Sequence, residues 1–330
     1  MNEQGVSLLL TCVVVIAFAW LLTAVIKQLS VRLNVVDEEG ERTLHKGTIP
    51  RGGGLAIVLA VCVGHLILHH LDYPFSLPAG IYLTLSLVAA TLGLLDDFFG
   101  LSVAPRLLVQ IAIGLGFYLT IDSHPIVNPM WGALSVVCFV LFAINAANFM
   151  DGADGLLASQ AITVAVCISL MFWTQADGVL SRHALVFAAA TAGFLFWNWH
   201  PAKIFLGDVG SYFVGASLVA LVLIAPEGAE ISLIILFIPL FADAMFTLLR
   251  RALRGVKIWK AHREHVYQRL IMKGVSPSWI SGYLTIILCV LFAPMSMAAI
   301  LYVEWAPILL LISLIISAAI WGLLYKFSAE

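Results

Sequence analysis

The stretch GVSLLLTCVVVIAFAWLLTAVI, residues 5–26, carries no charged side chain. A helix that crosses the hydrocarbon core of a bilayer needs about 20 mostly apolar residues. The run has no basic start and is followed by Lys27 and Arg32, so it predicts a retained membrane helix rather than a cleaved signal peptide. We therefore expect the bilayer to be the solvent of this chain.

Composition supports that expectation. Of the 330 residues, 62% are hydrophobic and 11% are charged, whereas soluble domains average about 25% charged residues. The formal net charge of −2 suggests no nucleic-acid partner. The cysteines lie singly inside apolar runs, which favours small buried side chains over disulfides or metal ligands.

Further apolar runs follow the first one, separated by short polar segments. No internal repeat and no Gly/Ser-rich or Pro-rich linker divides the chain. We expect an all-α, polytopic membrane bundle of about 11 transmembrane helices, forming a single domain over residues 1–330. The predicted spans are Gly5–Ile26, Gly53–Leu71, Ala79–Leu95, Arg106–Ile121, Met130–Ala146, Leu156–Thr174, His183–Trp197, Val209–Ala225, Ile231–Leu249, Trp279–Ala299 and Pro307–Tyr325.

The basic residues predict the orientation of these spans, because short loops rich in Lys and Arg stay in the cytoplasm. With the N-terminus outside and the C-terminus inside, all of the 17 Lys and Arg residues except Arg182 fall on the cytoplasmic side. The longest polar segments, residues 27–52 and 250–278, fall there too. Chemistry is therefore expected at the cytoplasmic face.

A pair of acids, Asp96 and Asp97, closes the third predicted span within the sequence GLLDDFFG. Two adjacent carboxylates at a membrane edge repel each other unless a cation joins them. Mg²⁺ prefers such oxygen ligands, usually one or two carboxylates together with substrate phosphates. The alternative is a pair of solvated acids at a helix end.

A second polar cluster, NAANFMDGADG, follows the fifth predicted span at residues 145–155. If the helix continues, Asn145, Asn148 and Asp151 share one face and Asp154 follows a turn later. The glycines permit close approach of the backbone to a ligand. Ligand binding and simple capping are both open, and four polar side chains in phase favour binding.

A third cluster, NWHPAKIFLGDVGS, links the seventh and eighth predicted spans at residues 198–211. Asp208 stands just before an apolar run, where a helix should begin. An N-cap is one interpretation. The other is a metal-binding carboxylate beside a phosphate, since a helix N-terminus attracts phosphate.

The fourth cluster, WKAHREH at residues 259–265, lies in the basic segment. His262 and His265 have a spacing that could bind Zn²⁺ on a helix, but Arg263 and Arg269 would repel a cation. Binding of phosphate by histidine and arginine fits better. Basic residues that meet anionic lipid are the alternative.

Two further features are less specific. The segment RTLHKGTIPRGGG, residues 42–54, mixes cations such as Lys46 with glycine and could cradle a diphosphate. Asp243 is an acid inside a predicted span, where ionisable residues are costly and usually functional. An ion pair with Arg250 and a role in the site are equally open for it.

Together, these clusters resemble the polyprenyl-phosphate N-acetylhexosamine-1-phosphate transferase superfamily, glycosyltransferase family 4. The resemblance runs from about Arg42 to Arg269. It implies that Asp96 and Asp97 are the paired catalytic aspartates and that Asp208, with Asp97, holds Mg²⁺ or Mn²⁺. It also implies catalytic roles for His262 and His265 and substrate-binding roles for Lys46, Asn148, Asp151, Asp154, Asn198, Phe205 and Arg263.

The histidine motif indicates which members of the superfamily this chain resembles most. The pentapeptide translocase of the superfamily has three consecutive histidines, whereas His262 and His265 here flank an Arg-Glu pair. The chain is thus more similar to the O-antigen-initiating enzymes, which use GlcNAc or deoxy-amino sugars such as FucNAc or QuiNAc. Which sugar it uses stays open.

The resemblance implies a reaction and a location. N-acetylhexosamine-1-phosphate would pass from a UDP-amino sugar to undecaprenyl phosphate, with release of UMP. This would be the first membrane step of an envelope polysaccharide such as O-antigen. The enzyme would lie in the bacterial inner membrane with its active site facing the cytoplasm, and a homodimer is allowed.

Two other functions remain as alternatives. A secondary transporter would fit the many spans and Asp243, but transporters place their polar groups near the midplane and often show inverted repeats. An intramembrane prenyltransferase also uses aspartate-rich Mg²⁺ motifs. It would lack a third acid beside Asp96 and Asp97 and would leave the histidine segment without a role.

Overall fold

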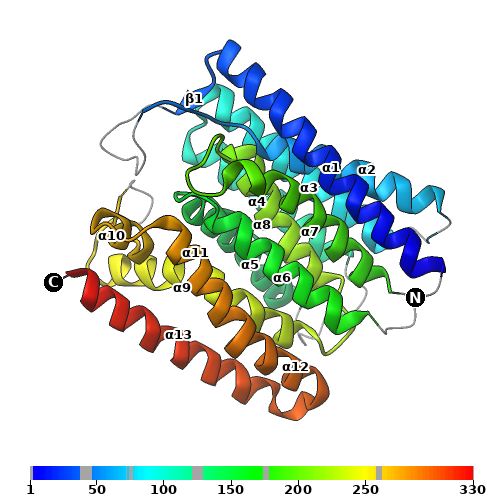
Figure 1. Ribbon diagram of the computed structural model, residues 1–330. Helices are drawn as coiled ribbons and strands as arrows, with labels where there is room; N and C mark the ends of the chain where they lie inside the picture. The colour runs from blue at the N-terminus through cyan, green and yellow to red at the C-terminus, as the bar shows by residue number, and fades with distance from the viewer. Residues whose placement is uncertain are drawn as a thin grey trace.

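The computed structural model describes residues 3–37, 47–71, 73, 77–120, 129–173, 178–257 and 262–329, most of them in long helices packed side by side (Figure 1). The elements in chain order are α1 (Glu3–Arg32), β1 (Val36–Asp37), β2 (Ile49–Pro50), α2 (Gly54–His70), α3 (Leu77–Phe99), α4 (Val103–Thr120), α5 (Pro129–Met150), α6 (Leu156–Phe172), α7 (Val179–Asn198), α8 (Gly207–Leu223), α9 (Glu230–Leu253), α10 (Val266–Met272), α11 (Pro277–Ile287), η1 (Leu288–Phe292), α12 (Ala293–Leu301), η2 (Val303–Trp305) and α13 (Ala306–Ala329).

The expectation of a polytopic helical membrane protein is confirmed. Each predicted span coincides with a helix to within a few residues, Trp279–Ala299 with the continuous run α11, η1 and α12. Within the described residues, eight helical segments are long and apolar enough to cross a bilayer, and α2, α6 and α8 are shorter apolar helices. The count of about 11 crossings stays a prediction.

Helix α8 forms the centre of the bundle. Its residues from Val209 to Val222 are all buried, as expected of a helix that is apolar on every side. Glycines let its neighbours approach closely. A Cβ atom on Gly93 of α3 would lie 2.2 Å from the carbonyl oxygen of Asp208, and one on Gly54 of α2 would lie 2.1 Å from Cα of Gly210. Small residues at such contacts are typical of membrane helices.

Backbone hydrogen bonds join two connections at one end of the bundle. The amide of Gly53 donates to the carbonyl of Phe205 at 2.9 Å, and the amide of Phe205 donates to the carbonyl of Pro50 at 2.8 Å. The amide of Gly54 donates to the carbonyl of Leu206 at 2.8 Å. The α1–α2 and α7–α8 connections therefore form one structural unit.

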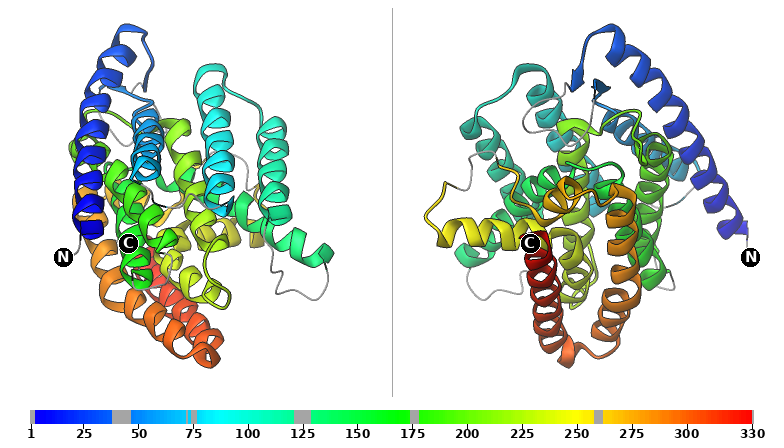
Figure 2. Two further views of the ribbon diagram at one scale, coloured as in Figure 1. Left: turned by 90° about the vertical axis from the view of Figure 1, so that its right-hand side faces the viewer. Right: turned by 60° about the vertical axis from the view of Figure 1, so that its left-hand side comes forward.

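The C-terminal helices attach at the same end. Lys273, after α10, donates to the carbonyl of Phe327 in α13 at 2.8 Å. Helix α9 contains Pro239, a residue that disturbs helical hydrogen bonding, and its C-terminal part projects sideways from the bundle (yellow in the right-hand view of Figure 2).

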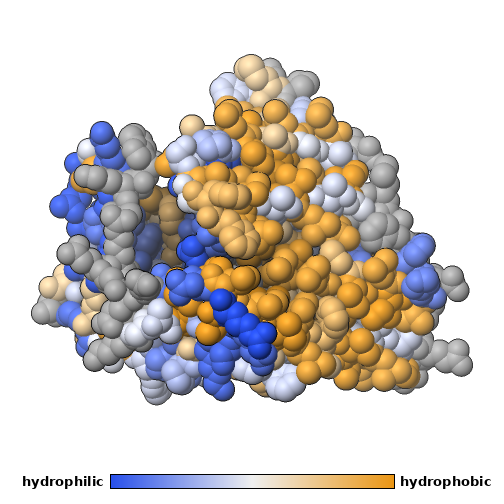
Figure 3. All heavy atoms as spheres, turned by 90° about the horizontal axis from the view of Figure 1, so that it is seen from above, coloured by the Kyte–Doolittle hydropathy of each residue, from blue (hydrophilic) through white to orange (hydrophobic). Residues whose placement is uncertain are grey.

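The surface matches a membrane protein. Seen from above, hydrophobic side chains cover most of the face, and hydrophilic ones gather mainly toward the end where α10 and the C-terminus lie (Figure 3). The N-terminus lies at the opposite end (Figure 1). The polar end is where the predicted site residues are found.

Candidate active site

Asp96 is held by three donors near the end of α3. Its Oδ2 accepts hydrogen bonds from Nη1 of Arg106 at 3.0 Å and from the hydroxyl of Tyr212 at 2.8 Å. Its Oδ1 accepts the amide of Leu101 at 2.8 Å. This carboxylate therefore joins α3 to the first turn of α4 and to α8.

Asp97 lies beside the start of α8 and is only partly satisfied. Its Oδ2 accepts the amide of Val209 at 3.0 Å. Its Oδ1 is buried and accepts no hydrogen bond from the described residues, and Nη1 of Arg51 lies 3.9 Å away. Gly207, with φ of 76°, permits this approach, because a Cβ atom there would meet Oδ2 of Asp97 at 2.9 Å.

Asp208 stands in the first turn of α8, as expected from the sequence. Its Oδ1 accepts a hydrogen bond from Nδ2 of Asn148 at 2.5 Å, and the same amide nitrogen lies 3.2 Å from Oγ of Ser211. Asn148 thus connects α5 to the carboxylate of Asp208 in α8. The predicted convergence of these motifs is present in the structure.

Asp151 belongs to the same electrostatic cluster and directly follows α5, which ends at Met150. Its amide still donates to the carbonyl of Ala147 at 3.1 Å, so the backbone keeps the helical hydrogen bond through this residue. Asn145 donates to Gln110 at 2.7 Å. Burial raises the pKa of Asp151 well above its ordinary value, and the negative charges of Asp208 and Asp97 raise it further.

Asp154 and Asn198 brace the loop that follows α5. Asp154 pairs with His200 at 2.7 Å and accepts the amide of Ala202 at 3.0 Å. The amide group of Asn198 accepts from the nitrogen of Gly155 at 3.0 Å and donates to the carbonyl of Ile204 at 3.1 Å. Asn198, the last residue of α7, and Asp154 thus join the α5–α6 connection to the α7–α8 connection.

Phe205 follows directly in the α7–α8 connection and is half-buried. Lys46 lies outside the described residues, so its predicted place beside the nucleotide stays a prediction. Arg263, which lies between His262 and His265 in the sequence, is half-buried.

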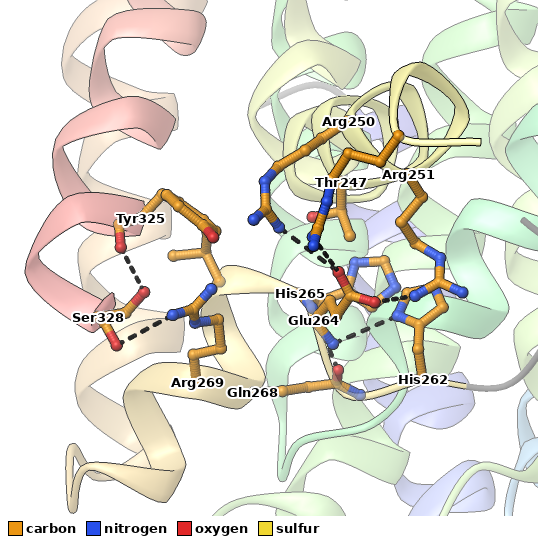
Figure 4. Close-up of polar contacts among 12 residues, drawn as sticks. Thr247, Arg250, Arg251, His262, Glu264, His265, Gln268, Arg269, Tyr325 and Ser328 are labelled. Carbon is orange, nitrogen blue, oxygen red and sulfur yellow. Dashed lines mark hydrogen bonds and ion pairs between the residues drawn. The ribbon is translucent and has the colours of Figure 1, made fainter. Parts of the chain in front are cut away.

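The histidine segment precedes α10 (Figure 4). The rings of His262 and His265 have centroids 4.9 Å apart, and the ring of His265 lies 5.7 Å from that of Phe149. The hydroxyl of Tyr267 donates to the carbonyl of Phe149 at 2.7 Å. This contact places the histidine segment against the loop that carries Asp151.

Glu264, between the histidines, lies close to three arginines at the C-terminal end of α9. It forms an ion pair with the buried Arg251, and Arg250 and Arg254 lie within 3.5 and 3.8 Å of its Oε2. Figure 4 shows Arg250 and Arg251 directed at this carboxylate. The pKa of His262 is lowered to about 4 by burial and by the neighbouring His265 and Arg251, so its imidazole is neutral near pH 7.

The residues fit a metal held by two carboxylates. Within the described part of the chain, no three His, Cys, Asp or Glu side chains form a metal-binding group. Mg²⁺, however, usually takes one or two carboxylates and completes its shell with phosphates and water. The buried Oδ1 of Asp97 and the crowding of Asp97, Asp151 and Asp208 are what such a cation would relieve.

Comparison with known proteins identifies the family. The family description "Glycosyl transferase family 4" matches residues 79–226. The chain is 30% identical over 300 residues, 84% of its own length and 80% of the relative's, to a probable undecaprenyl-phosphate N-acetylglucosaminyl 1-phosphate transferase of Bacillus subtilis. The chain belongs to glycosyltransferase family 4.

Other relatives agree with this placement. Among them is the undecaprenyl-phosphate alpha-N-acetylglucosaminyl 1-phosphate transferase of Escherichia coli K12, 27% identical over 75% of this chain and 72% of the relative. A phospho-N-acetylmuramoyl-pentapeptide-transferase of Bacillus velezensis is 26% identical over 77% of this chain and 86% of the relative. The glycosyltransferase family 4 match spans α3 to α8, the helices that carry the carboxylates.

Sequence reasoning missed part of this family 4 site. Arg106 was expected only as a cytoplasmic positive charge, and Tyr212 was not expected at all, yet both hold Asp96. Tyr212 follows Asp208 by four positions in α8, a helical spacing that could have placed it on the same face. Arg106 is the one basic residue in α4, in its first turn.

Proposed function

We propose that this protein transfers an N-acetylhexosamine-1-phosphate from a UDP-amino sugar to undecaprenyl phosphate and releases UMP. The observation that carries the proposal is the convergence of Asp96, Asp97, Asp208 and Asn148 beside two arginines at one end of a membrane bundle. The names of the relatives agree with this reaction.

The geometry suits phosphoryl transfer between a soluble and a lipid substrate. Such reactions depend mostly on positioning and on neutralising phosphate charge. Arg51 and Arg106 stand beside the paired aspartates, and their side chains are 38% and 31% exposed. A phosphate on a lipid would reach the bilayer surface at the level of these helix ends, so both substrates could meet there.

Asp97 and Asp208 would hold Mg²⁺, with Mn²⁺ as a substitute. When bound, the cation would supply positive charge to the diphosphate of the nucleotide sugar. Asp96 accepts hydrogen bonds on both oxygens, and its task would be to hold Arg106 and Tyr212 in place. The neutral His262 and His265 would contact phosphate oxygens or exchange a proton with them.

The proposal includes a location. The site lies on the side of the predicted topology that holds all Lys and Arg residues except Arg182, which favours a cytoplasmic active site in the bacterial inner membrane. The product would start an envelope polysaccharide such as O-antigen, and a homodimer is allowed. A transporter is less suited, since the described polar cluster lies at one end of the bundle.

The test is UMP release by the purified protein with Mg²⁺, undecaprenyl phosphate and, separately, the UDP derivatives of GlcNAc, FucNAc and QuiNAc. One sugar should yield UMP and a lipid-linked product of the corresponding mass. Omission of the lipid and addition of EDTA should each abolish release. Failure with every UDP-amino sugar, combined with liposome uptake of a solute, would replace the transferase by a transporter.

A further inference from the structure

Asp243 lies within α9 and ties three helices together. Its Oδ1 accepts hydrogen bonds from the hydroxyl of Thr247 at 3.0 Å, the amide of Val266 at 2.9 Å and the indole nitrogen of Trp321 at 3.1 Å. Its Oδ2 accepts the amide of Tyr267 at 2.9 Å. A carboxylate is suited to this position, because it can accept several hydrogen bonds at once and has no donor group that would need an acceptor.

The hydrogen-bond donors outside α9 belong to two helices that are far apart in the sequence, α10 and α13. Val266 and Tyr267 form the first turn of α10, directly after His265. Trp321 belongs to the C-terminal helix α13, where its ring stacks on that of Tyr325. Asp243 therefore fixes the start of α10 against both α9 and α13.

The same carboxylate faces the ring of His265. This histidine is 2% exposed, and its Nδ1 lies 3.9 Å from Oδ1 of Asp243. Nδ1 is buried and has no hydrogen-bond partner in the described part of the chain. Asp243 thus faces this nitrogen at a distance longer than a hydrogen bond, and its negative charge acts on the ring electrostatically.

The other charges around His265 are already engaged. From α9, Arg251 pairs with Glu264, and Arg250 and Arg254 flank the same carboxylate rather than Asp243. The ring of Tyr267 stacks on that of His265, and the rings of His262 and Phe149 lie beside it at a tilt. The ion pair between Asp243 and Arg250 considered from the sequence is replaced by the contact with Glu264.

We propose that Asp243 is a positioning residue that sets the orientation of His265 and the ring nitrogen on which its proton resides, with Trp321 holding Asp243 in place. This inference rests on the proposed function, in which His265 serves the phosphates. An acid beside Nδ1 favours the proton on that nitrogen and leaves Nε2 for the substrate. The anchoring helix α13 thereby becomes part of the active-site framework.

The test compares Asp243→Asn, Asp243→Glu and Trp321→Phe. Asparagine keeps the size of the side chain but loses the charge, and phenylalanine keeps the ring but loses its N–H donor. Matched controls are Glu230→Gln, at the other end of α9, and Trp305→Phe, in η2 directly before the other end of α13. Rates of UMP release are combined with ¹⁵N NMR of labelled histidine, assigned with His265→Gln.

We expect Asp243→Asn to lower kcat about 10- to 100-fold, as is common for residues that orient a reacting imidazole, with KM for the UDP-sugar little changed. Trp321→Phe should give a smaller loss, Asp243→Glu should recover part of the rate, and the controls should match the wild type. The ¹⁵N signals of His265 should show Nδ1 protonated in the wild type and a mixture of tautomers in Asp243→Asn.

Loss of the negative charge should also lower the pKa of His265, because Asp243 raises it against the opposing effect of burial. Unchanged ¹⁵N signals in Asp243→Asn would overturn the proposal, even if activity fell. A wild-type protein without UMP release would instead contradict the proposed function, and the ¹⁵N signals would still test the contact of Asp243 with His265.

Discussion

At the scale of single residues, the aspartates of the site differ in how firmly neighbouring donors hold them. Asp96 accepts three hydrogen bonds, whereas Oδ1 of Asp97 accepts none from the described residues. Asp208 accepts one from Asn148. Oδ1 of Asp97 therefore has the most room to take a cation, whereas the hydrogen bonds to Asp96 place its donors.

This difference predicts two kinds of defect. Asp97→Asn and Asp208→Asn should lower UMP release about 100-fold or more, on the scale of other lost electrostatic contacts in active sites, and should raise the Mg²⁺ concentration needed for half-maximal rate. Asp96→Asn should lower the rate without changing that concentration. Initial rates over a Mg²⁺ titration, with insertion verified in membranes, measure both.

The half-buried Asp37 of β1 provides the matched control, and Asp37→Asn should behave as the wild type. Wild-type rates in Asp208→Asn would remove this residue from the metal site.

The lowered pKa of His262 predicts a pH-dependent stability. Its folded-state pKa is about 4, below the ordinary value near about 6.5. The unfolded chain therefore binds a proton first as pH falls, and the folded state loses stability between about pH 6.5 and 4. His262→Gln should show a smaller drop in unfolding temperature from pH 7 to pH 4.5 than the wild type.

The exposed His69 serves as the control for this measurement. His69→Gln should keep the wild-type drop, and equal drops in all three proteins would contradict the assignment to His262.

At the scale of helices, the approach of α3 to α8 carries the site. Gly93→Ala would place a methyl group 2.2 Å from the carbonyl oxygen of Asp208. The helices must separate, which should cost about 1–3 kcal/mol of stability and should move Asp97 away from the amide of Val209. We expect a lower unfolding temperature in detergent and a reduced rate of UMP release.

Gly322 of α13 is the matched control, because a Cβ atom there would meet nothing within 4 Å. Gly322→Ala should leave both quantities unchanged. A Gly93→Ala protein as stable and active as the wild type would show that α3 and α8 do not depend on this contact.

The helix ends were the least predictable feature at this scale. The polar periodicity alone did not say whether the helix of Asn145 and Asn148 continues to Asp151, and the structure ends α5 at Met150. The sequence DGADG contains residues that favour turns. Asp151 therefore stands at the junction of α5 and this turn, where its amide still donates to the carbonyl of Ala147.

At the scale of the whole molecule, alternating helices bring distant motifs to one end. The order of apolar runs and the side on which the basic residues fall were enough to predict that Asp97, Asn148 and Asp208 would converge. The donors Arg106 and Tyr212 were not predictable in this way, because their contact with Asp96 depends on how α4 and α8 each pack against α3.

The orientation of the molecule in the membrane can be tested directly. On a background without the native cysteines, Lys326→Cys and Glu227→Cys place thiols at exposed positions near the C-terminus and in the α8–α9 connection. In intact spheroplasts, an impermeant maleimide should label Glu227→Cys and spare Lys326→Cys. The reverse pattern would place the carboxylate cluster outside the cell.

The hydrogen bonds that join residues 50–54 to residues 205–206 have a consequence for local opening. Amides that are bonded across two connections cannot be released one at a time, so Gly53, Gly54 and Phe205 should exchange with deuterium in a single cooperative event. A nucleotide that touches either connection should slow exchange in both, since its binding energy is shared by the whole opening unit.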